Sequence, residues 1–272
     1  MPSASHPIQI SLPLFREDSD WLLEFTKEAR REWARARRSG DPAKKAMALS
    51  HLSGCISDLE GPAAALRLTR RAHKLWEEVG DPSKMAMSRA VLAVRLLEAG
   101  LPHEALRQSS ASVLAMRGLG PQKRHKNLPH YMGKKFLMAG YAEEAQAWLE
   151  MAIENPAEGE RAGILAHLSR SLDLQGKLQE ARERQFEACK AFHLQEEPFT
   201  LAKGMLSLAR LDLRLGRRWE AGTLCQEVLR ILQGHGYDAE VAKAQELKRL
   251  CHGGQWPPPA GMVGEHAHPR TQ

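Results

Sequence analysis

The chain has 272 residues and a formal net charge of +6, from 39 lysines and arginines against 33 aspartates and glutamates. Hydrophobic residues make up 43% of it and charged residues 26%, which is typical of a folded globular protein and excludes a chain that is disordered throughout. Aromatic residues make up only 6%, and no segment alternates apolar and polar residues as a strand does, so the composition favours helices over sheets.

Residues 1–17 carry neither a secretory signal pattern nor a capped helix, and we expect them to be extended or disordered. No run of about 18 apolar residues exists, so we predict no membrane span. The four cysteines are far apart and form no CxxC pair, which fits a reducing compartment and disfavours a zinc cluster. We therefore expect a soluble, cytoplasmic protein without a metal site or a cofactor.

Residues 18–38 predict an N-terminal helix that packs on the segment after it. Asp18 and Ser19 provide a cap, and Trp21, Phe25 and Trp33 follow at helical spacing. The same stretch is rich in cations and continues into residues 39–45. Interleaved with Trp33, these cations suggest contact with nucleic-acid phosphates, whereas the alternative is a solvated helix face with its charges paired along the helix. The cations are Lys27, Arg30, Arg31, Arg35, Arg37, Arg38, Lys44 and Lys45.

Residues 43–235 contain a pattern that recurs five times. A glycine precedes an alanine by five residues in four copies, and a weaker copy has Ala65 with its glycine displaced by one position to Gly61. The alanines follow one another at steps of 40, 40, 36 and 40 residues. Eight residues before each glycine position stands Leu or Met, followed by a small residue. The four stronger pairs are Gly100/Ala105, Gly140/Ala145, Gly176/Ala181 and Gly216/Ala221.

This pattern predicts pairs of helices joined by tight turns. The glycine permits the left-handed conformation that ends the first helix of each pair, here called helix A. Small residues let helix A and the following helix B cross closely. The recurring glycines and alanines are therefore interpreted as packing features.

The end of the chain predicts a capping helix over 238–251. Val241, Ala244, Leu247 and Leu250 lie on one face of it, as required to cover the apolar side of the last repeat. Residues 252–272 are rich in glycine and proline, and we expect them to form a disordered tail.

The repeated motif resembles the tetratricopeptide repeat (TPR). The third copy matches best, and "GDP" closes a unit at 40–42 and again at 80–82. The period near 40 is similar to the longer variant found in Leu-Gly-Asn-type scaffolds and in sensor arrays of bacterial regulators. The resemblance implies an all-α, right-handed superhelical solenoid of about five helix-turn-helix repeats with capping helices at both ends, forming one domain over 18–251. The matching residues of the third copy are Met132, Gly133, Phe136, Gly140, Glu144, Ala145 and Ala152.

The resemblance also implies a non-enzymatic module that binds a peptide or helical segment of another protein in a concave groove lined by the A helices. Lys134, Arg170 and Arg210 occupy one structural position in three successive repeats, which predicts a basic stripe suited to carboxylates or phosphates. The alternative is that they are ordinary solvated charges. The groove residues implied by the family's register are Met47, Met87, His130, Lys134, Arg170, Lys203 and Arg210.

The sequence carries no legible catalytic constellation, since it lacks HExxH, a phosphate-binding glycine loop and any nucleophile with a histidine at a recognisable spacing. A second functional hypothesis is a sensor or regulatory protein of transcription or signalling that contacts nucleic acid through its basic N-terminal helix. The partner's identity and the oligomeric state do not follow from the sequence.

Overall fold

The computed structural model describes residues 16–195 and 197–251, and within them the chain is helical with no strand. The chain divides into two compact units, residues 1–112 and 113–272, and each is described by itself. The division falls within α5. None of the helices in the described ranges has the length and apolar content needed to span a bilayer.

The first unit consists of an N-terminal helix followed by helix pairs. In chain order its helices are α1 (Arg16–Ser39), α2 (Pro42–Glu60), α3 (Pro62–Val79), α4 (Pro82–Glu98) and the first part of α5 (Pro102–Leu119). The two "GDP" motifs explain where α2 and α4 begin. Gly80, with a φ of 74°, ends α3, Asp81 accepts the amide hydrogens of Ser83 and Lys84 at 2.9 and 3.0 Å, and Pro82 opens α4.

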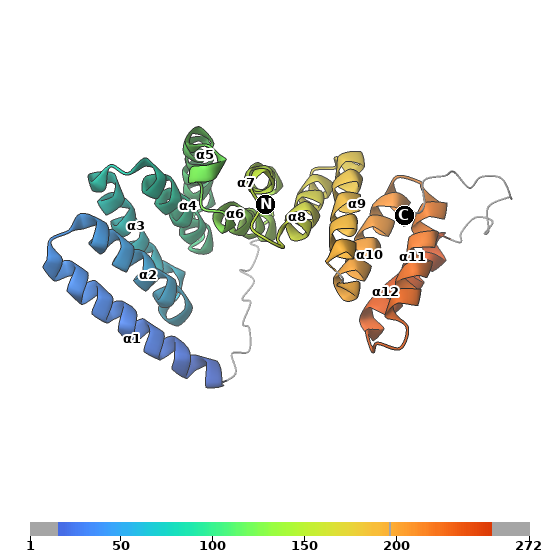
Figure 1. The fold of residues 1–272 in the computed structure, drawn as a ribbon, viewed down its shortest axis with the longest axis horizontal. Helices are drawn as coiled ribbons and strands as arrows, with labels where there is room; N and C mark the ends of the chain where they lie inside the picture. Colours follow the sequence, from blue (N-terminus) through green and yellow to red (C-terminus); the bar gives the residue numbers. More distant parts are fainter. Residues whose placement is uncertain (1–15, 196, 252–272) are drawn as a thin grey trace, which may run out of the picture. The chain divides into compact units, whose positions relative to one another are not determined.

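The second unit continues the same alternation, and Figure 1 shows its helices following one another in chain order. Each helix packs on the next, while α6 also contacts α8 and α10 also contacts α12. Helices α6, α8 and α10 are thus the A helices, and α7, α9 and α11 are the B helices. After the short η1 (Pro121–Lys123) they are α6 (Asn127–Met138), α7 (Ala142–Glu154), α8 (Arg161–Leu174), α9 (Leu178–Leu194), α10 (Pro198–Arg214), α11 (Arg218–Leu232) and α12 (Asp238–Cys251).

The predicted turn recurs with the same hydrogen bond in four repeats. Gly140 has a φ of 86°, and the amide of the next residue, Tyr141, donates to the Phe136 carbonyl at 2.9 Å. This is the closing bond of a Schellman motif, which needs a residue with positive φ. In the weaker copy, Gly61 combines a φ of 87° with a ψ of 171°, which is a different conformation. The other three bonds are Leu101 N–H to Leu96 O, Lys177 N–H to Leu172 O and Arg217 N–H to Asp212 O.

The small residues lie at helix crossings, as the pattern predicts. Ala145 is fully buried, and a Cβ added to Gly133 would lie 2.5 Å from Cγ of Leu149. In the next repeat the hydroxyl of Ser169 donates to the Ala181 carbonyl at 2.7 Å, so the A helix also bonds to the B-helix backbone. Bulky side chains at these positions would separate the helices.

A buried ion pair joins α9 to α10. The side chain of Asp212 is completely buried and accepts hydrogen bonds from the guanidinium of Arg182. Burial raises the pKa of Asp212, and the contact with Arg182 opposes that rise. Removing Arg182 would leave the fully buried carboxyl of Asp212 without its partner.

The aromatic residues of α1 that pack on the core are not all those that the sequence predicts. Ala29 is buried and Trp33 packs with the first core cluster, beneath the guanidinium of Arg71 at 5.1 Å from the ring centroid. Trp21 and Phe25, which the helical spacing placed on the packing face, are 66% and 53% exposed and stack on each other at 5.5 Å. Only the C-terminal half of α1 is therefore anchored through large side chains.

The first and last helices can be compared with the bounds predicted for the two ends of the solenoid. Helix α1 begins at residue 16, within the segment predicted to be extended, while residues 1–15 and the predicted tail 252–272 lie outside the described residues. Helix α12 covers the span predicted for the capping helix, with Ala244 buried and Val241 and Leu247 packed against the core. Leu250, expected on the same face, is 55% exposed.

Candidate binding face of the second unit

Three cations occupy the same position on the three A helices of the second unit. Lys134, Arg170 and Arg210 each follow the small residue that contacts helix B, so their side chains leave the helix on the other side. All three are exposed, and among the described residues none has a carboxylate at ion-pair distance. The three side chains are therefore accessible to solvent, and the binding stripe that they were expected to form stays a prediction.

Lys134 and Arg170 each follow, by one helical turn, a histidine of the same helix, and the two histidines are in contact. His130 on α6 places its Nε2 3.0 Å from Nδ1 of His167 on α8, and its Nδ1 lies 2.6 Å from Oε2 of Glu160. Burial, and then the charges of His130, Lys134 and Arg170, lower the pKa of His167 to about 4, against an opposing effect of Glu160. Lys134 of α6 and Arg170 of α8 thus both act on the partly buried ring of His167. The contact between His130 and His167 joins the two helices at this point. His167 is not among the residues that the family's register predicted.

The second and third cations flank an ion pair between neighbouring A helices. Arg214 of α10 contacts Asp173 of α8 through Nη1 and Oδ1. Arg170 precedes Asp173 by one helical turn, and Arg210 precedes Arg214 by one turn. The pair therefore places Arg170 and Arg210 on one face of the unit.

Lys203 lies two turns before Arg210 on α10 and has a different environment. Its Nζ sits 5.2 Å from the ring centroid of Phe199, which stacks on Tyr237 at 4.2 Å. The exposed ammonium of Lys203 thus makes a cation–π contact with one ring of an aromatic pair. Tyr237, the second ring of that pair, directly precedes α12. The position of Lys203 on an A helix agrees with the predicted set.

The two predicted methionines lie in the first unit. Met47 on α2 is 45% exposed, whereas Met87 on α4 is half-buried. The positions equivalent to the three cations are Gly54 and Val94 here, and Val94 is buried. The repeated cations are therefore a feature of the second unit, whereas the two methionines belong to the first unit.

Comparison with known proteins identifies the fold. No family model matches the sequence, and no curated protein is similar to it. Among solved structures, BtubC from P. vanneervenii has a TM-score of 0.58 at 17% identity, covering 87% of this chain and 94% of that chain. The C-terminal part of a TPR repeat-containing protein from Cytophaga hutchinsonii has a TM-score of 0.59 at 12% identity, with 84% and 82% covered.

The fold is a TPR-like solenoid. A third similar structure is a signal transduction ATPase with a TPR sensor from Pyrococcus horikoshii. Its TM-score is 0.59 at 18% identity, and the match covers 88% of this chain but 40% of that chain. At these identities the comparisons establish the arrangement of the helices alone.

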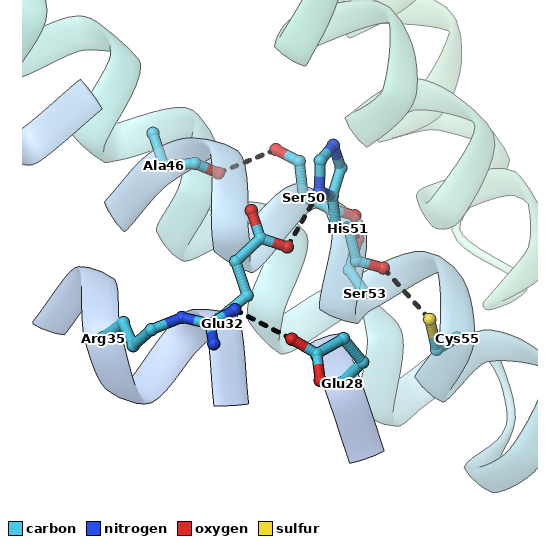
Figure 2. A network of polar contacts seen from close by, with 8 residues as sticks. All are labelled: Glu28, Glu32, Arg35, Ala46, Ser50, His51, Ser53 and Cys55. Carbon is cyan, nitrogen blue, oxygen red and sulfur yellow. Dashed lines mark hydrogen bonds and ion pairs between the residues drawn. The ribbon is translucent and has the colours of Figure 1, made fainter. Parts of the chain in front are cut away.

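The basic N-terminal helix of the TPR-like solenoid has most of its charges engaged. Figure 2 shows Arg35 paired with Glu28 at 2.8 Å and His51 of α2 in contact with Glu32 at 3.2 Å. Trp33, the aromatic residue proposed to accompany the cations, is packed against the core. The interpretation as a helix face with paired charges therefore describes most of this surface. The other ion pairs are Lys27–Glu24, Arg30–Glu60, Arg31–Glu28 and Lys44–Asp41.

A hollow of about 240 Å³ lies on the B-helix side of the solenoid, between α7, α8 and α9. Its apolar lining includes buried Leu165, Leu168 and Leu172, and charged residues surround them. No local sequence pattern indicates this hollow, because residues of three different helices line it. The charged lining residues are Glu150, Arg161, Glu180, Arg184 and Glu187.

A histidine and a serine in contact join α3 to α4. Nδ1 of His73 lies 2.8 Å from Oγ of Ser88 and its Nε2 lies 3.4 Å from Glu77, but Ser88 is buried and its hydroxyl also donates to the Met85 carbonyl at 3.0 Å. Such a serine bridges α3 and α4 rather than facing a substrate. Burial also lowers the pKa of His73, so its ring is held in the neutral form.

The cysteines are free and buried, as expected for structural thiols. Burial raises the pKa of Cys189 and of Cys225 to about 12, which keeps both in the unreactive thiol form. Across residues 16–251, apart from 196, no group of three or more His, Cys, Asp or Glu side chains is arranged to hold a metal ion.

Proposed function

We propose that the chain is a protein-interaction module whose second unit binds an acidic segment of another protein across α6, α8 and α10. The observation that carries the proposal is the set of three exposed cations at one repeated position, each without a carboxylate partner among the described residues. Elsewhere many of the basic side chains lie in ion pairs, as on α1 and between α8 and α10. Unpaired cations at a repeated position are suited to an external anion.

The spacing of the A helices defines the kind of segment that fits. Packed helices lie about 8–10 Å apart, and an extended peptide advances about 3.3 Å per residue. Carboxylates about three residues apart in an extended segment would therefore meet successive cations. Each partly desolvated charge pair contributes about 0.5–2 kcal/mol, so no single cation dominates binding.

The test is a charge reversal with a matched control. Lys134, Arg170 and Arg210 are replaced together by Glu, and binding of a labelled peptide with Glu at about every third position is measured by fluorescence anisotropy. Three lost pairs at about 1 kcal/mol each predict a loss of affinity of about 100-fold, with helicity and thermal stability nearly unchanged.

The control carries the same change in net charge on B helices. Arg67 and Lys74 on α3 and Arg218 on α11 are exposed and, like the first set, have no carboxylate at ion-pair distance among the described residues. Their reversal is expected to weaken binding by no more than a few-fold, through long-range attraction alone. Equal losses in both triple variants would show that net charge, and not the A-helix face, attracts the peptide.

The nucleic-acid alternative receives less support. The pairing of the α1 cations leaves little free charge for phosphates, and Trp33 is unavailable for stacking. Phosphate contacts would make affinity fall steeply with salt. Binding of single- or double-stranded nucleic acid that is lost when Arg37 and Arg38 are reversed would favour that alternative over the peptide.

A further inference from the structure

Two histidines in direct contact lie one helical turn before the cations of α6 and α8. The ring of His130 is mostly buried, with 12% of its side chain exposed, and both of its nitrogens are engaged. Glu160 accepts at Nδ1, so this nitrogen carries a hydrogen. The hydrogen bond to His167 then determines where any further proton can be placed.

The protonation states of the pair follow from counting hydrogens. When both rings are neutral, Nε2 of His130 has no hydrogen and accepts from Nδ1 of His167, so that Nε2 of His167 is a bare acceptor. One added proton changes this in either of two ways. It binds directly to Nε2 of His167, or it charges His130 and shifts the tautomer of His167. In both cases Nε2 of His167 gains a hydrogen and becomes a donor.

The surroundings of His167 oppose that proton while no anion is bound. The charged groups that act on the ring are His130 and Lys134 from α6, Arg170 from α8, and Glu160 just before α8. Lys134 follows His130 by one turn, and Arg170 follows His167 by one turn, so both cations flank the histidine pair on the exposed side. A third positive charge is unfavourable there unless a negative group arrives with it.

We infer that Lys134, His167 and Arg170 form a subsite for an oxyanion, and that the anion binds together with one proton. The two cations supply charge, and Nε2–H of His167 supplies a directed hydrogen bond. The ligand class is the oxyanion of an acidic protein segment, either an Asp or Glu carboxylate or a phosphorylated hydroxyl. The identity of this segment rests on the proposed function, whereas the anion subsite itself does not.

The proposal has a defined pH dependence. Because anion and proton favour each other's binding, the anion must raise the pKa of His167, and a lower pH must strengthen anion binding. The pKa of the free site is about 4. Carboxylates of the ligand stay mostly ionised down to about pH 5, so a pKa of His167 raised by about one unit predicts an affinity that rises about two-fold as the pH falls from about 7 to 5.

The first test measures the subsite without any peptide. The ring signals of the full chain are followed by NMR during pH titrations in sodium sulfate and in sodium chloride of equal ionic strength, and the His167 signal is assigned with His167→Gln. Sulfate is expected to raise the titration midpoint of His167 by about one pH unit. Replacing both Lys134 and Arg170 by Gln should abolish that rise. A midpoint that does not respond to sulfate, or an equal response at exposed His125 and His235, would overturn the inference.

The second test separates the inference from the proposed function. Calorimetry in buffers of different ionisation enthalpy measures proton uptake when a Glu-containing peptide binds at about pH 5. If the bound carboxylate raises the pKa of His167 from about 4 to about 5, uptake of about 0.4 proton is expected. His167→Gln keeps a donor but cannot titrate, so it should bind without uptake and with a weaker pH dependence.

The outcomes of the two tests are distinct. Peptide binding without proton uptake would refute the subsite and leave the proposed function standing. A sulfate response without peptide binding would support the subsite and refute the acidic-segment function. The affinities of the Glu peptide and of its phosphoserine counterpart, compared at about pH 7.5 where both are fully ionised, identify which of the two oxyanions the site prefers.

Discussion

Three helical glycines of the second unit allow the close-packing argument to be tested with one methyl group. In Gly133→Ala the new Cβ would lie 2.5 Å from Cγ of Leu149, a fully buried side chain that cannot easily move. In Gly204→Ala it would lie 3.2 Å from Sγ of Cys189, which requires a small shift. In Gly163→Ala it meets only Cε1 of His130 at 3.7 Å, an ordinary contact.

The same substitution should therefore have effects of different sign. Replacing a helical glycine by alanine gains about 0.5–1 kcal/mol from backbone entropy and propensity. Overpacking a rigid core costs about 1–3 kcal/mol. Gly133→Ala is expected to destabilise the fold by about 1–2 kcal/mol, Gly204→Ala to be nearly neutral, and Gly163→Ala to stabilise it by up to about 1 kcal/mol.

Urea unfolding followed by circular dichroism measures the series, with the slopes compared so that changes in cooperativity are recognised. Because all three glycines lie in the second unit, the comparison does not depend on how the two units unfold. If Gly133→Ala were as stable as the unsubstituted chain, the close crossing of α6 and α7 would be refuted.

Three further predictions concern stability. Ala145→Leu should lower the melting temperature by several degrees because Ala145 is fully buried. Ala157→Leu, at a half-buried loop position, should change the melting temperature little. Similar melting temperatures of the two variants would contradict the close crossing of α6 and α7. Arg182→Ala should cost about 3–5 kcal/mol in urea unfolding because it leaves the fully buried Asp212 carboxyl unpaired; a loss below about 1 kcal/mol would show that the pair is dispensable. The lowered pKa values of His73 and His167 mean that protonation favours the unfolded chain. Stability from these rings is present above about pH 6.5 and is lost as the pH falls below that value, for His167 down to about pH 4. His73→Gln should therefore flatten the pH dependence of the melting temperature, and an unchanged profile would contradict the burial of its neutral form.

The helix pairs were predictable because the local chemistry of the turn is demanding. A turn that needs a positive φ selects glycine, and a close crossing selects a small residue five positions later, so Gly140 and Ala145 mark their elements in the sequence itself. The five-fold recurrence then identifies the solenoid even though no family model matches the chain. The assignment to the longer-period variant remains a prediction.

The binding face was only partly predictable, because it depends on contacts between helices. The shared position of the three cations in the repeat makes them predictable from the sequence. His167 is not, because it lies one residue away from the position of helix A that the TPR register assigns to the groove. Its contact with His130 joins residues 37 apart in sequence, and no local pattern indicates it. The packing of Trp33 on the core and the exposure of Trp21 likewise do not follow from helical spacing alone, since each step of four residues from Trp21 to Trp33 shifts the side chain around the helix by about 40°.

The recurring Schellman bond has a consequence for folding. Leu101, Tyr141, Lys177 and Arg217 each donate an amide hydrogen across an equivalent turn, so the four amides report the opening of four successive repeats. Their hydrogen-exchange rates, measured in one experiment, give the local free energy of each repeat on a common chemical scale. In a quasi-one-dimensional array that set of values reveals where unfolding begins and in which direction it spreads along the chain.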